Sequence, residues 1–193
     1  IISLIILIII IICILVYRNK NYHRIRPVFC TSPKSGKETQ ILSQEYIRPL
    51  GSAYSYSFHF FIYIKDFDYR YDFYKEVFCK GEKEDACPSF YLTPKVNNGV
   101  VKIKTGKGMA TFLVRNIDVR KWCHIAICVK DGEVDIYYKG KLQTTGVLGE
   151  FCKINGEPLY VGRDGGFSGL IYRLSYTPHF LKPSEVLKLA SIN

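Results

Sequence analysis

The sequence predicts an all-β protein, a sandwich of short strands with an apolar helix before it and a short helix at its end. Two observations carry this prediction. Runs rich in Tyr, Phe, Val and Ile alternate with turn residues from about residue 54 onward, a pattern typical of sandwiches and barrels. The chain is also 48% hydrophobic and only 23% charged, which excludes disordered, collagenous and coiled-coil proteins.

The first seventeen residues, IISLIILIIIIICILVY, contain Ser3 as their one clearly polar side chain. As a helix they would span about 25 Å, close to the thickness of a bilayer's hydrocarbon core. Cations follow directly, which favours the cytoplasmic side for the domain. The sequence therefore predicts a single-pass transmembrane anchor over 1–17. A signal peptide, whose small-residue cleavage site is missing here, and a buried element of the domain are the alternatives. The residues expected inside the bilayer include Ile1, Ile5, Ile10, Leu15 and Tyr17.

Residues 18–40 are basic and carry Pro27, Pro33 and Gly36 without a clear period. We expect this segment to be a juxtamembrane linker, and the domain to occupy 41–193. The cations expected at the anionic lipid surface are Arg18, Lys20, Arg24 and Arg26. The remaining excess of a formal net charge of +10 is dispersed along the chain. No nucleic-acid partner is predicted, because such an interface needs a continuous cationic patch.

Ten strands are expected in the domain, each a short apolar or alternating run between turns. They cover 54–65, 75–79, 89–92, 100–104, 110–114, 122–130, 133–138, 141–145, 159–161 and 169–177. Asp131 and Gly132 suit a two-residue hairpin turn that needs positive φ. In the strand before this turn, Ile125, Ile127 and Val129 alternate with less apolar residues, so one face should pack on a second sheet.

A short helix is expected at the end of the domain, over 183–190. Proline stands at its start and Glu185 in its first turn, both favourable positions. Val186, Leu187 and Leu189 are expected to dock on the sandwich.

The seven cysteines and the absence of any Asn-x-Ser/Thr sequon predict free thiols in a reducing compartment. The number is odd, and Cys13 lies inside the apolar run. Cys79 and Cys87 flank a short loop, and a disulfide between them stays open. A zinc site is not predicted, because the sequence has no CxxC motif and no cluster of cysteines and histidines at zinc-ligand spacing.

Several segments resemble the laminin-G-like, concanavalin A-like jelly roll. They are residues 55–64, 121–127, 134–142, 159–162 and 166–171, and residues 181–186 resemble the terminal helix of that family. The match covers roughly residues 50–190 in the family's order, and it implies a concanavalin A-like (laminin-G-like) jelly-roll β-sandwich. Three residues are expected to be structural. Trp122 would close one end of the core, whereas Gly162 and Gly169 would allow bends and close backbone approach.

Within that superfamily, an apolar N-terminal anchor with an aspartate-rich segment, here DFDYRY at 66–71, resembles virion proteins of large DNA viruses of algae and amoebae. This resemblance implies a non-enzymatic structural role, as a minor capsid protein that links the internal membrane of a giant virus to the capsid shell. The implied partners are the membrane and other virion proteins. The alternative is a membrane-anchored carbohydrate-binding, lectin-like domain for host attachment.

Catalysis is not predicted. The glucanase branch of the superfamily would need paired carboxylates in an ExDxxE strand. Glu133 and Asp135 supply the first half, but Tyr138 stands where the partner acid is needed. No nucleophile arrangement with a neighbouring base is recognisable, and no cofactor is expected apart from calcium.

Calcium and carbohydrate are binding possibilities that the resemblance implies. Many laminin-G-like domains hold calcium through rim-loop oxygens, for which the candidates are Asp66, Asp68 and Asp72, or Asp164. Nearby cations oppose such a cage. The aromatic residues numerous enough to build a sugar platform are Tyr69, Tyr71, Phe73, Tyr74 and Phe167, although aromatics in a sandwich normally face inward.

Overall fold

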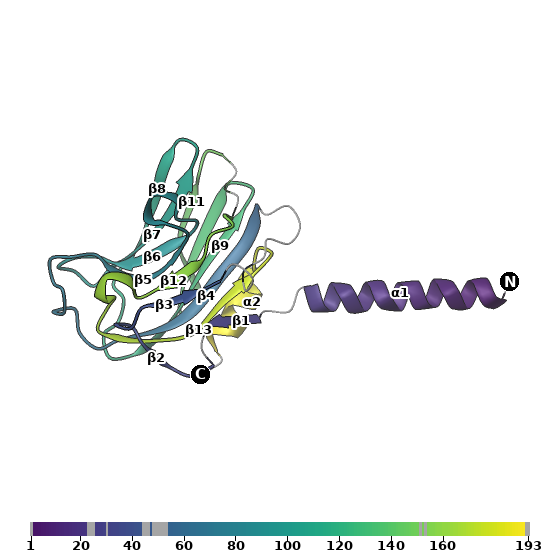
Figure 1. The fold of residues 1–193 in the computed structure, drawn as a ribbon, viewed down its shortest axis with the longest axis horizontal. Helices are drawn as coiled ribbons and strands as arrows, with labels where there is room; N and C mark the ends of the chain where they lie inside the picture. Colours follow the sequence, from purple (N-terminus) through teal and green to yellow (C-terminus); the bar gives the residue numbers. More distant parts are fainter. Residues whose placement is uncertain are drawn as a thin grey trace.

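Two antiparallel sheets face one another and form a β-sandwich (Figure 1). The computed structural model describes residues 2–22, 26–29, 31–43, 47, 54–150, 152 and 154–191, with side chains from residue 6 to 16 and from 31 onward among these. The predicted all-β sandwich class is confirmed. Ile1 and Arg24 lie outside the described residues, as do the side chains of Ile5, Tyr17, Arg18, Lys20 and Arg26.

The first sheet, which we call the β4 sheet, has a continuous antiparallel order. Its strands are β1 (Arg26–Phe29), β13 (Gly169–Thr177), β4 (Ser55–Ile64), β9 (Trp122–Lys130), β10 (Glu133–Tyr138) and β11 (Lys141–Val147), with β2 (Lys34–Ser35) also on β13. Segment 18–40, expected to be a linker, thus contributes two strands to this sheet. Strand β13 lies between β1 and β4, so the sheet joins both ends of the domain, whereas β9, β10 and β11 follow one another in the chain.

The second sheet, which we call the β5 sheet, packs against the first. Its strands are β3 (Gln40–Leu42), β12 (Leu159–Val161), β5 (Lys75–Lys80), β6 (Ser89–Leu92), β7 (Gly99–Thr105) and β8 (Gly108–Val114). Every strand that the sequence predicted is present, with ends within two residues of the prediction. Short 3-10 turns, η2 (Lys83–Asp85) and η3 (Arg163–Gly165), follow β5 and β12.

The core between the sheets is aromatic at its centre. Phe78 of β5 stacks on Phe58 of β4, with ring centroids 5.6 Å apart, and meets Phe60 edge-on at 5.4 Å. Phe60 in turn packs edge-on against Phe90 at 5.2 Å. These contacts are favourable beyond the buried area alone. All four rings are fully buried, so the alternation of β4 fixes which of its faces points inward.

The hairpin between β9 and β10 follows the sequence pattern. Asp131 and Gly132 both have positive φ, at 50° and 85°, as a two-residue turn requires. Ile125, Ile127 and Val129 belong to the core between the sheets, which confirms the predicted inward face of β9.

The opposite face of β9 carries Trp122, His124, Ala126 and Cys128. Trp122 is only partly buried and packs on Tyr63, with ring centroids 5.6 Å apart. This differs from the expectation that Trp122 closes the core, and the reason is register. Cys123, its neighbour, points into the core, so alternation turns the indole outward.

Helix α2 (Pro183–Ala190) covers part of that outer face, as predicted. Val186 is buried in a small cluster with Ala126 and Cys128, and Leu189 packs against its edge. Leu187 is exposed instead of docked, because one helical step of about 100° from Val186 turns it away from the sheet. The main-chain NH of Lys182 donates to the Glu185 carboxylate at 2.8 Å and holds the start of the helix.

Helix α1 (Ile2–Tyr22) lies apart from the sandwich (Figure 1). Its apolar side chains from Ile6 to Val16, Ile10 and Leu15 among them, are each about half exposed. The helix continues past Tyr17 because no proline or glycine interrupts it before Pro27. Among the residues described, no helix is both long enough and apolar enough to span a membrane. The transmembrane anchor predicted over 1–17 is therefore not supported.

The open sides of the two sheets meet where β8 faces β11. Thr144 Oγ1 donates to the Leu113 carbonyl at 2.8 Å, and Gln143 Nε2 donates to the Arg115 carbonyl at 2.9 Å. Gly146 lies so close to Phe112 that an added Cβ would stand 2.2 Å from its ring. Side chains of β11 thus close this side of the sandwich.

Candidate functional site

A small pocket opens on the outer face of the β5 sheet and holds about 190 Å³. Its walls come from β5, β6, β7, η2 and η3. The lining residues are Tyr74, Glu76, Lys83, Tyr91, Lys102, Arg163 and Asp164. We call this the β5 pocket. Two tyrosines, two carboxylates and three cations in so small a space form a mixed aromatic and charged site.

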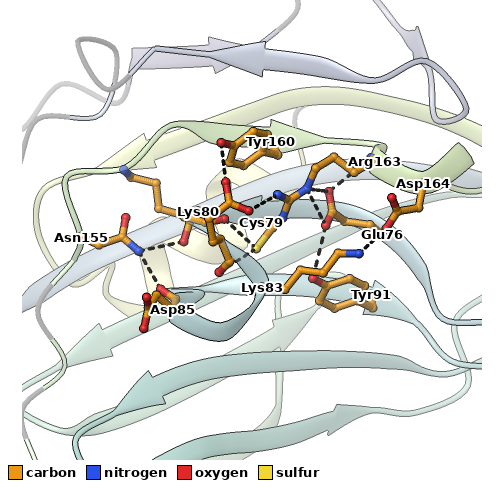
Figure 2. A network of polar contacts seen from close by, with 12 residues as sticks. Glu76, Cys79, Lys80, Lys83, Asp85, Tyr91, Asn155, Tyr160, Arg163 and Asp164 are labelled. Atoms are coloured by element: carbon orange, nitrogen blue, oxygen red, sulfur yellow. Dashed lines mark hydrogen bonds and ion pairs between the residues drawn. The ribbon is translucent and has the colours of Figure 1, made fainter.

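The floor of the pocket is an ion pair between Glu76 and Arg163 (Figure 2). Arg163 Nε lies 3.0 Å from Glu76 Oε1 and 3.1 Å from Oε2, and the Arg163 main-chain NH donates to Oε1 at 3.2 Å. The Tyr91 hydroxyl donates to Oε2 at 3.3 Å. The side chains of Glu76 and Arg163 are only 2% and 14% exposed. The carboxylate is thus fully engaged by groups from two other segments.

Local backbone features bring these two residues together. The register between β5 and β6 shifts between Glu76 and Phe78, as in a bulge that re-aims a side chain. At the end of β12, Gly162 adopts φ 65°, and a Cβ there would lie 2.8 Å from the Gly36 carbonyl. The following turn carries Arg163 over Glu76. At this φ and this distance, glycine avoids a clash that a side chain would cause.

Glu76 keeps the Arg163 guanidinium charged in spite of its burial. Burial lowers the pKa of the Arg163 guanidinium, but the hydrogen bond and charge of Glu76 outweigh burial, and the pKa is raised overall. Arg163 Nη1 also pairs with Glu82 at 3.0 Å, and the guanidinium lies 3.9 Å above the Tyr160 ring. Its Nη2 is buried and has no hydrogen-bond partner among the described residues. One donor group of the floor is therefore unused.

The rim of the pocket is formed by Tyr74, Tyr91 and Lys102. The two rings meet edge-on, with centroids 6.4 Å apart. Lys102 Nζ lies 4.7 Å from the Tyr74 ring centroid and 5.3 Å from that of Tyr91, within the range of a cation–π contact. In the part of the chain that the structure describes, Lys102 forms no ion pair. Its charge is therefore available to a ligand.

Two further pairs border the site. Lys83 of η2 forms an ion pair with Asp164 of η3, which lowers the pKa of Asp164. The Tyr160 hydroxyl donates to Glu82 Oε1 at 2.7 Å. Beyond them, Asn155 Nδ2 ties the carbonyls of Lys80 and Asp85 together at 3.0 and 2.8 Å (Figure 2). The turn η2 is thus held in place from both sides.

The titratable groups around the pocket suit binding more than catalysis. Burial, followed by the charge of Glu76, raises the pKa of the Cys79 thiol to about 11, so it stays protonated at neutral pH. Burial also raises the pKa of Tyr91. The Glu76 carboxylate is held in the ion pair with Arg163. Neither an activated nucleophile nor a free acid–base pair lines this pocket.

The predicted calcium ligands are engaged separately. Asp66 accepts hydrogen bonds from Ser168 Oγ at 2.7 Å and from the Tyr69 NH at 3.1 Å. Asp72 pairs with Lys95 at 3.5 Å, and Asp164 pairs with Lys83. The residues described contain no group of three His, Cys, Asp or Glu that could hold a metal ion. Calcium binding at Asp66, Asp68 and Asp72 stays a prediction, and the structure does not group these carboxylates around one point.

The predicted aromatic platform is mostly dispersed. Tyr74 lines the β5 pocket, whereas Phe167 is buried in the core. The Tyr69 hydroxyl donates a hydrogen bond to the Gly165 carbonyl at 2.9 Å. Tyr71 and Phe73 are exposed near the pocket's side of the sheet without lining it. Only one of the five therefore belongs to the site.

Two other predictions concern fold residues and cysteines. A Cβ at Gly169, which the sequence singled out for close backbone approach, would lie 2.1 Å from the Tyr63 carbonyl. Cys79 and Cys87 are both in the thiol form, without a disulfide to any described cysteine. Cys79 Sγ contacts the Gly81 carbonyl at 3.2 Å, and Cys87 Sγ contacts the Tyr56 hydroxyl at 3.1 Å, so the two are not bonded to each other.

Sequence reasoning missed Glu76, Tyr91, Lys102 and Arg163 as site residues. They come from four segments, and only the strand register unites them. One signal was present: β5 reads KEVFCK, with three charged residues in a strand that is buried throughout. Charged residues in such a strand are almost always paired, so a pairing partner could have been sought.

No protein-family model matches the sequence, and neither does any curated protein. Solved structures do match. The binding domain of Paraclostridial Mosquitocidal Protein 1 has a TM-score of 0.66 at 17% identity, over 86% of this chain and 45% of that one. The botulinum neurotoxin serotype G binding domain has a TM-score of 0.58 at 15% identity, over 72% and 36%.

A third match is the ligand-binding domain of botulinum neurotoxin serotype D in complex with N-acetylneuraminic acid. Its TM-score is 0.64 at 11% identity, over 82% of this chain and 45% of that one. At these identities the likeness shows a shared β-sandwich fold. The chain spans less than half the length of each of these structures.

Proposed function

We propose that this chain is a non-enzymatic carbohydrate-binding module of the laminin-G-like type, and that its β5 pocket holds one acidic sugar residue. The observation that carries the proposal is Lys102, a cation without a carboxylate partner among the described residues, placed over two tyrosine rings at the pocket rim. Such a lysine provides charge for an anion, and the adjoining ring offers an apolar face for a sugar.

The chemistry of the walls supports an acidic sugar in particular. The Tyr74 side chain is 51% exposed, so its ring can stack on the C–H face of a sugar without rearrangement. Three cations, Lys83, Lys102 and Arg163, line the pocket against two carboxylates, so its charge favours an anion. The volume of about 190 Å³ is below that of pockets for drug-sized ligands, which favours a single ring.

The structural neighbours support the same class of function. They are binding domains of protein toxins, and one of them was solved with N-acetylneuraminic acid, an acidic sugar. Because the chain spans less than half of each neighbour, the location of that ligand carries no weight here. The neighbours thus support an acidic sugar as the class of ligand. The lining of the β5 pocket supports this pocket as the place where it binds.

A glycan array with the full chain tests this proposal, followed by titration of the best acidic glycan and its neutral counterpart. We expect saturable binding of the acidic glycan only. Lys102→Ala should weaken binding about tenfold, or about 1.4 kcal/mol, as for a lost charged hydrogen bond. Lys104, on the same face of β7 and outside the pocket, gives the control Lys104→Ala, which should bind normally. Equal loss in both variants, or no glycan bound, would refute the proposal.

A structural role in a virion is the second candidate, and the apolar exposure of α1 favours it. The side chains from Ile6 to Val16 are about half exposed, which is costly in water. We propose that lipid covers them. The domain would then stand at the internal membrane of a virus particle, as a minor capsid protein facing the shell.

Two measurements test this second candidate. The full chain should float with anionic liposomes, and a variant without residues 2–22 should not. Protease treatment of intact virus particles should spare an internal protein and degrade one exposed for host attachment. Failure to float would refute lipid binding, whereas complete degradation would refute the internal position and leave the sugar-binding proposal untouched.

A further inference from the structure

The side chains of Tyr56, Cys87 and Cys152 lie together in the interior of the sandwich. The Tyr56 hydroxyl lies 3.1 Å from Cys87 Sγ and 3.5 Å from Cys152 Sγ. Both sulfur atoms therefore contact the same hydroxyl group. Cys87 is 3% exposed and Cys152 is 2% exposed. The two sulfur atoms are therefore neighbours in a site closed to water.

The two cysteines come from separate parts of the chain. Cys87 stands between η2 and β6, and Cys152 stands in the connection between β11 and β12. Cys152 Sγ also contacts the Lys104 carbonyl of β7 at 3.3 Å. A bond between them would tie both connections to the β5 sheet.

We propose that Cys87 and Cys152 form a disulfide when the chain folds in the presence of a small disulfide oxidant such as oxidised glutathione. This modification site is independent of the sugar-binding pocket. It joins a pair that no local spacing in the sequence indicates.

The exchange proceeds in two balanced steps. One protein thiolate attacks a sulfur of oxidised glutathione, so a mixed disulfide forms and one glutathione leaves as a thiolate that takes up a proton. The second protein thiol loses its proton and attacks the protein sulfur of the mixed disulfide, so the second glutathione leaves. The two protein sulfurs lose two electrons in total, and oxidised glutathione gains them.

In the folded site the two thiols differ in acidity. Hydrogen bonds from Cys87 and then Tyr56, acting against burial, lower the pKa of the Cys152 thiol. The hydrogen bond to Cys152, with burial, raises the pKa of Cys87. The folded surroundings thus favour ionisation of Cys152 over that of Cys87. Because the folded site is closed, the exchange with glutathione takes place while the chain folds.

The other described cysteines of the sandwich lack such a partner. Cys79 Sγ contacts main-chain carbonyls, and Cys123 Sγ contacts Tyr138 and main-chain carbonyls. Burial raises the pKa of Cys128 to about 12. Oxidation should therefore be selective for one pair.

The test refolds the full chain in glutathione buffers from reducing to oxidising, blocks remaining thiols, and maps the unreduced tryptic peptides by mass. Cleavage after lysine places Cys87 in peptide 84–95 and Cys152 in peptide 142–153, each with no other cysteine. We expect a single dominant cross-link between these two peptides in oxidising buffer, two hydrogens lighter than their sum. The cross-linked chain should unfold more than tenfold more slowly in denaturant, reversibly with dithiothreitol.

Variants assign the effect. Cys152→Ser should abolish both the cross-link and the slow unfolding, and Cys79→Ser is the matched control that should keep both. The peptide map of the unaltered chain decides the proposal even where a variant fails to fold. No cross-link in oxidising buffer, or a mixture that includes peptides 76–80 or 122–130 at equal yield, would overturn it.

Discussion

The buried ion pair of the β5 pocket gives a sharp stability prediction. We consider Glu76→Gln, which keeps the shape of the side chain and removes its charge. Three donor contacts from Arg163 and one from Tyr91 converge on this carboxylate. After the substitution, the guanidinium stays mostly buried, and its remaining partner is Glu82, whose side chain is 56% exposed.

The cost follows from that imbalance. Removing one member of a buried pair costs about 3–5 kcal/mol, because the other charge stays buried and uncompensated. The amide oxygen of glutamine still accepts one hydrogen bond, so we expect about 3 kcal/mol. For a chain of this size that corresponds to a Tm lower by roughly 6–12 °C.

Urea denaturation followed by tryptophan fluorescence, together with a thermal scan, measures the effect. The matched control is Asp72→Asn, which breaks the Lys95–Asp72 pair, a pair 3.5 Å apart with both side chains about two-thirds exposed. That control should cost less than about 1 kcal/mol. If the two variants lose the same stability, or if Glu76→Gln is neutral, the argument that burial makes this pair indispensable is wrong.

Two further predictions follow from other parts of the sandwich. His59 and His124 are packed with ring centroids 5.4 Å apart, and their ring nitrogens have no hydrogen-bond partner in the described part of the chain. Burial, and for His59 the nearby His124, lowers their pKa values to about 3 and about 4. Because the folded pKa lies below the unfolded value, stability is complete above about pH 6.5 and is lost as pH falls, by about 2 kcal/mol for each imidazole between pH 7 and 5. Urea titrations at both pH values check this, and His124→Phe should roughly halve the slope; an unchanged slope contradicts it. Gly169→Ala should destabilise by more than about 2 kcal/mol, because its Cβ would lie 2.1 Å from the Tyr63 carbonyl, and a chain with unaltered Tm would disprove that close approach.

The strands of the sandwich could be predicted well because the signals for them lie within short segments of the sequence. Strand β9 alternates apolar and mixed residues along its length, and the Asp131-Gly132 turn demands positive φ at both positions. Such signals need no knowledge of distant partners. Trp122 shows the limit: its identity suggested a core residue, but the inward position of Cys123 turned it outward.

The pocket could not be predicted in the same way. Glu76 and Arg163 become neighbours only through the order of β5 and β12 in the sheet. The same holds for Cys87, whose nearest cysteine in sequence is Cys79, while its actual neighbour is Cys152. Contacts of this kind depend on register, which pattern analysis of single segments does not supply.

The closed side of the sandwich has a consequence for self-association. An outermost strand with vacant carbonyls invites a second chain to extend the sheet, which leads to fibres and aggregates. On β8 the carbonyl of Leu113, and just beyond it that of Arg115, already accept side-chain donors from Thr144 and Gln143. Along this border, the side chains of Thr144 and Gln143 therefore occupy two carbonyls that a second chain would need in order to extend the sheet.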